Sequence, residues 1–385
     1  MNRRWVMIAV LLGANAAAAQ VVTSPPTDPQ RGGGRGRGQP QREMWRTAAD
    51  TQRAKQLYVS RDTTDLPKLD SAGYVRNAAD RARIEANFEK YSKGVMQFEK
   101  VSWRSDADGL EIPAYVFSPL SKRGARGHAA MVWVHGYVHG RFDDHFFPFV
   151  KEAVERGYVI IAPNYRGSTG YSQDFYNAID YGGKEVDDVY SAYAFIRSSL
   201  PYVDPDRVGI MGWSHGGFIT AHILFRDNQP FKAGAPMVPV TNLFFRLARS
   251  GPGYARQFST QPGFQGLPHE KVQTYIDRSP VFRAANLKVP VLIHVATNDC
   301  DVYFWENQQM VYTLMALHPA LTDAKIYTDP PVGNLGGCGH TFSERVIMDA
   351  SSPRHLQRDD TPEQIDAWNR TWSFFEKHLN PNKGK

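Results

Sequence analysis

A serine flanked by glycines, in the stretch Gly-Trp-Ser-His-Gly-Gly at residues 212–217, constrains the fold more than any other feature of this sequence. Residues 207–212 (RVGIMG) form an apolar run typical of a short buried strand, and the sequence from His215 onward (HGGFITAHILF) is typical of a helix. Strand, sharp turn and helix in this order predict a strained turn, called a nucleophile elbow, that holds the hydroxyl of Ser214 clear of the sheet. Glycines suit such a turn because a Cβ there would clash with the neighbouring strand and helix.

Apolar runs alternate with helical patterns along residues 98–385, which indicates an α/β fold. Two strands around an Asp-x-Asp-Gly turn come first. The later runs lie at residues 129–136, 158–165, 207–212, 232–239, 289–296 and 324–329. Continuous apolar strands between helices favour a mostly parallel central sheet with helices on both faces. Residues 241–280 interrupt the alternation with glycine, proline and aromatic residues, so we expect them to form a cap or pocket insert.

The chain before the α/β domain (98–385) divides into three segments. Residues 1–19 combine a basic start, an apolar core and small residues, which predicts a secretory signal peptide. Their apolar run is too short to span a bilayer comfortably, so we expect a periplasmic or secreted protein with no stable membrane anchor. Residues 20–42, rich in Gly, Arg and Pro, are expected to be a disordered linker. Residues 43–97 are expected to form an N-terminal helical segment.

The net charge of +6 lies almost entirely at the start of the chain. Residues 1–42 hold six arginines and one aspartate, which gives them +5, so residues 43–385 carry only +1. A domain so close to neutral offers no basic platform, and we expect no nucleic-acid partner. The sequence makes no prediction of the oligomeric state.

Two residues downstream of the elbow are suited to activate its serine. A serine hydroxyl is a weak nucleophile until a base removes its proton, and the partners on this kind of elbow follow in the order Ser, acid, His. Asp299 ends an apolar run (VLIHVATND), and His340 lies in a glycine-rich loop (GGCGH). We therefore predict that His340 is the general base for Ser214 and that Asp299 orients the imidazole. Asp301 is the alternative acid, but Asp299 comes first after the strand.

The negative oxygen that develops during acyl transfer needs two hydrogen-bond donors. One is expected to be the backbone N–H of His215, and the other to come from Tyr137, by its backbone N–H or its phenol. Tyr137 lies in the stretch HGYVHGRFDDHFF (135–147), which contains three histidines and two aspartates. Their spacing matches no common ligand pattern, so we expect no metal site.

The chain contains only two cysteines, Cys300 and Cys338. The first directly follows Asp299, and the second precedes His340 by two residues. If the acid and the histidine meet, the two cysteines must lie close together, and in an oxidising compartment they are expected to form a disulfide. The alternative is a pair of unpaired buried thiols.

Five sequence blocks together resemble the catalytic domain of the prolyl oligopeptidase family of serine peptidases. They are NYRGSTGYSQDF (164–175), GGKEVDDV (182–189), DPDRVGIMGWSHGGF (204–218), SPVFRAANLKVPVLIHVATNDCDV (279–302) and GH (339–340). The resemblance implies an α/β-hydrolase fold, a triad of Ser214, Asp299 and His340, and no metal or organic cofactor. It also implies that Tyr137 assists the oxyanion.

The chain departs from this family in three ways. Fewer than 100 residues precede the hydrolase part, so we expect no β-propeller. Asp301 stands where the family often supplies a donor to a substrate carbonyl, and an ionised carboxylate cannot donate. Leu243 and Arg246 fall where aromatic residues of the family stack on proline. These three residues are therefore candidates for substrate binding. The departures argue against proline specificity, and the aspartate favours an amine or hydroxyl group on the substrate.

Three functions fit this pattern. The first is a secreted serine peptidase that acts on a peptide through an acyl-enzyme. The second is a carboxylesterase that uses the same triad on a small non-peptide acyl substrate. The third is a catalytically silent binding protein, because a fold alone does not establish activity.

Overall fold

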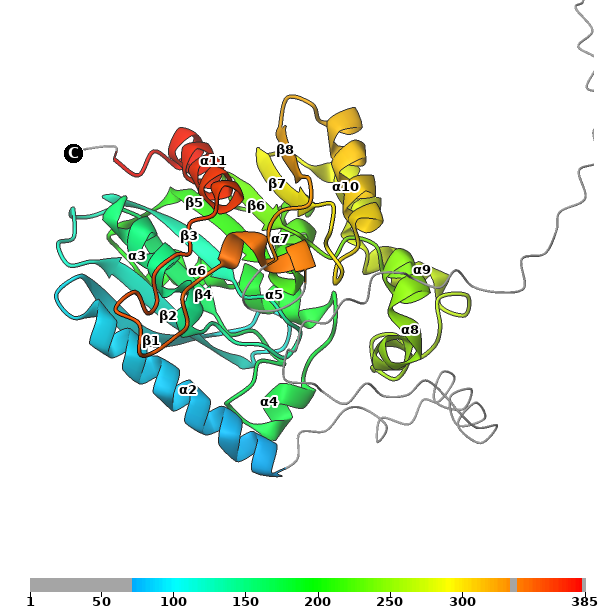
Figure 1. Ribbon diagram of the computed structural model, residues 1–385. Coiled ribbons are helices and arrows are strands. Elements are labelled where there is room, and N and C mark those ends of the chain that lie inside the picture. Colours follow the sequence, from blue (N-terminus) through cyan, green and yellow to red (C-terminus); the bar gives the residue numbers. More distant parts are fainter. Residues whose placement is uncertain (1–70, 333–337, 383–385) are drawn as a thin grey trace, which may run out of the picture. The chain divides into compact units, whose positions relative to one another are not determined.

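The structure, a computed structural model, describes residues 71–332 and 338–382 (Figure 1). The expected signal peptide (1–19), the linker (20–42) and the first part of the helical segment lie outside the described residues. The chain divides between Glu43 and Met44, and all described residues belong to the second unit.

An eight-stranded sheet forms the centre of this unit, with the strand order β1-β2-β4-β3-β5-β6-β7-β8. β1 pairs antiparallel with β2 and β2 with β4, whereas every other neighbouring pair is parallel. The strands are β1 Met96–Arg104, β2 Glu111–Pro119, β3 His128–Val134, β4 Val159–Pro163, β5 Val203–Trp213, β6 Gly234–Met237, β7 Val291–Ala296 and β8 Thr322–Tyr327. The prediction of a mostly parallel sheet is confirmed.

The sheet is buried on both faces, as its central strand β3 shows. Ala130, Val132 and Val134 belong to one hydrophobic cluster, while the residues between them belong to the other. Successive side chains of a strand point to opposite faces, so a strand covered on both sides must be apolar throughout. This is why the strands appear in the sequence as continuous apolar runs.

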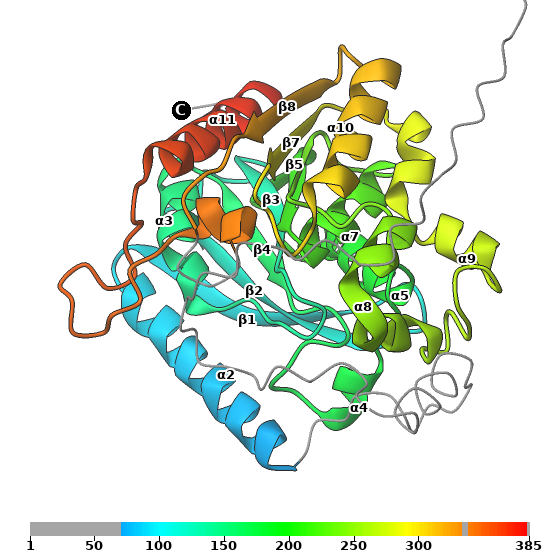
Figure 2. The same ribbon diagram turned by 45° about the vertical axis from the view of Figure 1, so that its right-hand side comes forward.

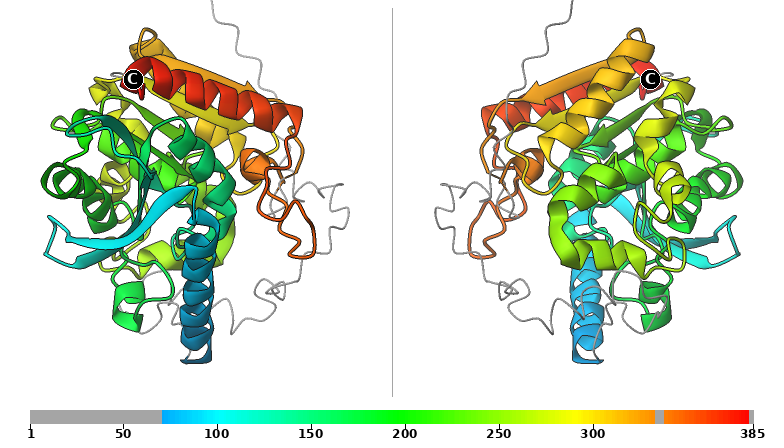
Figure 3. Two further views of the ribbon diagram at one scale, coloured as in Figure 1. Left: turned by 90° about the vertical axis from the view of Figure 1, so that its left-hand side faces the viewer. Right: turned by 90° about the vertical axis from the view of Figure 1, so that its right-hand side faces the viewer.

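Helices supply both covers. The described helices are α2 Ser71–Ser92, α3 Phe147–Glu155, α4 Gln173–Asn177, α5 Lys184–Tyr190, α6 Ala192–Ser199, α7 His215–Leu224, α8 Leu243–Ser259, α9 Val272–Asp277, α10 Phe304–Leu317 and α11 Pro362–Leu379. Residues of α2, α3 and α11 pack into one cluster, and residues of α5, α6, α7 and α10 pack into the other. Both views of Figure 3 show α11 running alongside β7 and β8.

Helix α2 packs directly against the hydrolase sheet and is the described part of the expected helical segment. It lies along β1 and β2 (Figure 2). The ring of Phe88 is fully buried, with its centroid 5.4 Å from Phe98 and 5.1 Å from Phe117. Its polar side holds a distant loop, because Arg83 and Asn87 both donate to the carboxylate of Asp144.

Candidate active site

Ser214 lies at the turn between β5 and α7, in a conformation that few non-glycine residues adopt. β5 ends at Trp213 and α7 begins at His215, and Ser214 between them has φ 54° and ψ −114°. A positive φ costs energy in a residue with a Cβ, so the surrounding structure must hold it. The Ser214 N–H donates to the carbonyl of Met237 at 3.0 Å. A Cβ at Gly216 would lie 2.2 Å from the carbonyl oxygen of Val134, which explains the glycine.

His340 and Asp299 meet at the carboxyl ends of the parallel strands. Asp299 follows β7, and His340 lies in the short 3-10 segment Cys338–Glu344. The Nδ1 of His340 lies 2.7 Å from Oδ2 of Asp299, and both side chains are buried. The other oxygen, Oδ1, accepts the backbone N–H groups of Asp301 and Val302, each at 2.9 Å. The carboxylate is therefore fixed where it can orient the imidazole and stabilise its cation.

Asp301, the alternative acid, faces the other nitrogen of the same imidazole. Its Oδ2 lies 3.5 Å from Nε2 of His340, and its Oδ1 accepts from Nη2 of Arg246 at 3.0 Å. Burial lowers the pKa of His340, but the negative charges of Asp299 and Asp301 outweigh it, so the pKa lies above its usual value. Asp301 thus affects the histidine through charge, whereas Asp299 occupies the orienting position.

A disulfide joins the loops that carry the acid and the histidine. Cys300 and Cys338 are bonded with a Cα–Cα distance of 5.9 Å, which confirms the predicted pairing. Beside it, the Gly339 N–H donates to the carbonyl of Asn298 at 3.2 Å. A Cβ at Gly339 would lie 1.9 Å from Oδ1 of Asn298, so a larger residue at this position would displace the Asn298 side chain.

The two expected oxyanion donors lie on either side of Ser214. His215 is the first residue of α7, whose N–H has no partner within the helix. Burial lowers the pKa of the His215 imidazole to about 3, so the side chain is neutral. Tyr137 has φ 60° and its carbonyl accepts the hydroxyl of Tyr165 at 2.6 Å. Tyr137 as a whole is 62% exposed. The roles of His215 and Tyr137 stay predictions.

Two cavities open beside Ser214, and Ser214 and Tyr137 line both of them. The first, which we call the histidine cavity, has a volume of ≈200 Å³ and contains His340 in its wall. The second, which we call the insert cavity, has a volume of ≈420 Å³ and is walled partly by Arg246 of α8. Helices α8 and α9 lie within residues 241–280, where the composition predicted a pocket insert.

The expected substrate-binding residues divide between the insert cavity and the core. Arg246 and Asp301 line the insert cavity, and Nε of Arg246 donates to the hydroxyl of Tyr254 at 3.0 Å. Leu243 differs from the expectation, since its side chain is fully buried in the hydrophobic core and lines neither cavity. As the first residue of α8, it is held there by its N–H, which donates to Oγ of Ser279 at 2.9 Å.

Several buried charged residues near the site escaped the sequence analysis. Arg166, within the NYRGSTGY block, forms a buried ion pair with Asp188 at 2.8 Å. Glu185, in the GGKEVDDV block, lies 3.6 Å from Nε2 of His215, and burial raises its pKa to about 8. Both lie in sequence blocks that carry the family resemblance, and this position was the signal that could have identified them. Glu344 lines the histidine cavity and belongs to no such block.

The three histidines of residues 135–147 have separate partners. His135 stacks on Tyr165 with ring centroids 4.3 Å apart, His139 stacks on Tyr176 at 3.8 Å, and His145 pairs with Asp143. In the described ranges no group of three His, Cys, Asp or Glu side chains is placed to hold a metal ion. Among the same residues, no helix has the length and apolar character needed to cross a membrane.

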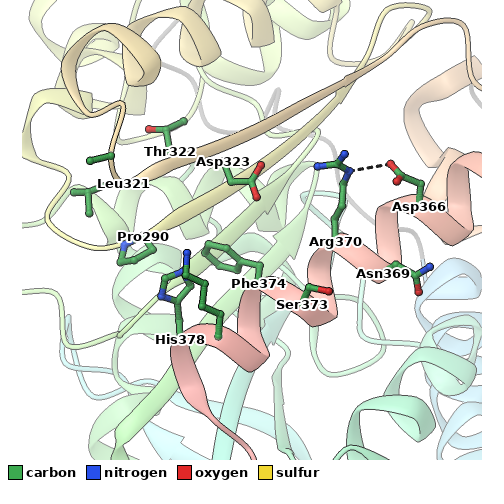
Figure 4. A pocket seen from close by; sticks show the side chains of 12 residues that line it. Pro290, Leu321, Thr322, Asp323, Asp366, Asn369, Arg370, Ser373, Phe374 and His378 are labelled. Carbon is green, nitrogen blue, oxygen red and sulfur yellow. Dashed lines mark hydrogen bonds and ion pairs between the residues drawn. The ribbon is translucent and has the colours of Figure 1, made fainter.

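Another cavity, of ≈460 Å³, lies between α11 and the starts of β7 and β8 (Figure 4). Pro290 and Thr322 line it beside the ion pair of Asp366 and Arg370, whose atoms are 3.0 Å apart. Ligands of open α/β sheets bind outside the carboxyl ends of the strands, whereas this cavity lies at the amino ends. It is therefore separate from the candidate site.

The sheet order, the elbow and the paired acid and histidine define an α/β hydrolase with a Ser-Asp-His arrangement. Residues 144–330 match the sequence model of the prolyl oligopeptidase family. This match confirms the expected resemblance to that family over the region that holds Ser214 and Asp299.

The similar proteins are peptidases by name. The chain is 30% identical over 245 residues to the uncharacterized peptidase YuxL of Bacillus subtilis, covering 63% of this chain and 36% of the relative. It is 31% identical over 194 residues to dipeptidyl aminopeptidase BIII of Pseudoxanthomonas mexicana, covering 49% and 28%. The acylaminoacyl peptidase of Pyrococcus horikoshii has a similar structure, with a TM-score of 0.58 and 23% identity over 78% of this chain and 44% of that one. The chain thus spans about a third of the length of the two curated relatives.

Proposed function

We propose that this protein is a serine hydrolase of the peptidase type, with Ser214 as nucleophile and an acyl-enzyme as intermediate. The observation that carries the proposal is the fixed pair of His340 and Asp299, because His340 lines the same cavity as the strained Ser214. No other arrangement in the described ranges combines a strained serine with an oriented histidine.

The proposed reaction follows from these positions. Nε2 of His340 takes the proton of Ser214 as Oγ attacks the substrate carbonyl, and the N–H groups of His215 and Tyr137 hold the oxyanion. The imidazolium, stabilised by Asp299, then gives its proton to the leaving amine as the C–N bond breaks. A water molecule, activated by the same imidazole, hydrolyses the acyl-enzyme and frees the serine.

A peptide substrate is favoured over a simple ester by the named activities of the relatives. Peptidases that release acylamino acids and dipeptides are among the similar proteins. Cleaving an amide requires a proton donor at the leaving nitrogen, and the raised pKa of His340 favours the protonated form that can serve as this donor. The carboxylesterase is the second candidate, since the same residues also hydrolyse esters.

The test is labelling with a fluorophosphonate, which reacts only with an activated serine. The wild-type protein is expected to label, and Ser214→Ala to lose all labelling. Peptide-amide and short-chain ester substrates are then compared on the same preparation. Hydrolysis of esters alone would identify a carboxylesterase, and a folded wild type that does not label would favour the silent binding protein.

We also propose that the protein is exported, with residues 1–19 removed. Two features support this: the signal-like start of the chain and the disulfide between Cys300 and Cys338, a bond that persists mainly in oxidising compartments. N-terminal sequencing of the mature protein from its native host is expected to begin at Gln20. A mature protein that retains residues 1–19 would contradict the proposal.

A further inference from the structure

The histidine cavity is the place where a leaving group must lie. His340 lines this cavity and is absent from the wall of the insert cavity. A leaving atom must come within hydrogen-bond distance of the imidazole that protonates it. The leaving group therefore enters the histidine cavity, and the acyl part of the substrate lies in the larger insert cavity. At ≈200 Å³ the histidine cavity is smaller than the about 300–1,000 Å³ of drug-sized pockets, and so has room for about one residue.

Glu344 is an unsatisfied carboxyl group in the wall of this cavity. It lies four residues after His340 in the same 3-10 segment, and its residue is only 6% exposed. Its buried Oε1 has no hydrogen-bond partner, and its carboxylate forms no ion pair, within residues 71–332 and 338–382. Burying a carboxyl group without a partner is costly, so a bound group that supplies a donor would be stabilised there.

Besides His340, two side chains of the cavity wall can carry a positive charge, and both already have carboxylate partners. Arg141 lies 3.7 Å from Asp80 and donates to Oγ1 of Thr169 at 3.1 Å. His145 is paired with Asp143. These pairs leave Glu344 as the carboxyl group of the wall that forms no ion pair with another described residue. The aromatic rings of Phe146 and Trp213 complete the wall and can contact an aliphatic chain.

We propose that the histidine cavity binds the leaving residue of the substrate and that Glu344 selects leaving residues with a positively charged side-chain amine, as in lysine. The inference rests on the proposed function. It is supported by the titration of Glu344, since burial raises the pKa of the carboxyl group to about 7, and an ammonium group would favour the ionised form.

The test measures protection of Ser214 from the fluorophosphonate by two leaving-group mimics. Lysine amide and norleucine amide have the same side-chain length apart from the terminal amine. Lysine amide is expected to protect the wild type at about tenfold lower concentration, as a charged hydrogen bond implies. The difference is expected to disappear in Glu344→Gln and to survive, weakened, in Glu344→Asp.

Glu306→Gln is the matched control. Glu306 is also buried, burial likewise raises its pKa to about 7, and it does not line the histidine cavity. It accepts the N–H groups of Thr241 and Asn242, which the oxygen of a glutamine can also accept. This variant is expected to keep the preference for lysine amide.

Each other outcome has a defined meaning. Equal protection by the two amides in the wild type would overturn the inference even if Glu344→Gln fails to fold. Stronger protection by glutamic acid amide would show that the cavity recognises a carboxylate through Arg141 or His145, and would also overturn it. A wild type that does not label would instead overturn the proposed function. A protein that labels but shows no preference for the amine would overturn only the inference about Glu344.

Discussion

The two nitrogens of one imidazole face two different carboxylates in this site. Asp299 contacts Nδ1 of His340, and Asp301 lies 3.5 Å from Nε2, the nitrogen that accepts the serine proton in the proposed reaction. The first carboxylate is fixed by two backbone N–H groups, whereas the second is tied to Arg246 and is partly exposed. At the scale of the residue, this asymmetry separates Asp299, which orients the imidazole, from Asp301, which acts on its pKa through charge alone.

We expect Asp301→Asn to shift the pH profile of the enzyme toward acid. The base must be neutral to act, so kcat/KM rises as pH increases through the pKa of His340, which the two carboxylates raise. Removing one carboxylate lowers this pKa, and the acid limb of kcat/KM is expected to move to lower pH. Asp299→Asn is the comparison, because losing the orienting group should reduce kcat at every pH by orders of magnitude. An acid limb that does not move in Asp301→Asn would refute the assignment.

Elements that are distant in sequence hold the site together. Helix α2 anchors the loop of the histidine cavity, since Arg83 and Asn87 contact Asp144, next to His145. The sequence predicts the helix from its amphipathic pattern, but it contains no signal for this contact, which spans 57 residues between Asn87 and Asp144. The disulfide is different, because both cysteines stand beside residues of recognisable motifs and their pairing was therefore predictable.

Breaking the disulfide is expected to affect both the stability of the fold and the geometry of the site. In the chain-entropy account, closing a loop with a sequence separation of 38 stabilises the protein by about 4 kcal/mol. The variant with both Cys300→Ser and Cys338→Ser should lose up to this amount of unfolding free energy in urea. Because the bond joins the loops of Asp299 and His340, the labelling rate of the folded fraction should fall as well. Unchanged labelling of the folded double variant would show that the bond serves stability alone.

For the whole molecule, the fold and the meeting of Asp299 with His340 near Ser214 could be predicted because each depends on a local pattern. Ser214 and Asp299 follow apolar strands, and His340 follows Gly339, which lies close to Asn298. Leu243 was misplaced because the resemblance assigned it by position, whereas its burial depends on contacts with elements distant in sequence. Glu344 was missed because its character comes from burial, which depends on all the surrounding elements.

Buried neutral histidines are expected to make the whole fold sensitive to acid. Burial lowers the pKa to about 3 for each of His135, His215, His222 and His294. Below about pH 6.5 the unfolded chain protonates these groups while the folded protein does not. Stability therefore falls with decreasing pH, by about 1.4 kcal/mol per pH unit for each histidine, until the folded-state pKa is reached.

The raised pKa values of His145 and His340 act in the opposite direction. The buried carboxyl groups of Glu185, Glu306 and Glu344 do so as well, because burial raises their pKa values to about 7 or 8 and the folded protein therefore binds their protons before the unfolded chain does. The wild-type slope is thus much smaller than the four histidines alone would give, and a single-histidine variant is the test. In urea between pH 5 and pH 7, His294→Gln should lose less unfolding free energy toward acid than the wild type, by about 1.4 kcal/mol per pH unit, because the Nε2 of His294 is buried and has no hydrogen-bond partner in the described part of the chain. An unchanged slope in His294→Gln would mean that His294 opens to solvent and protonates in the native state.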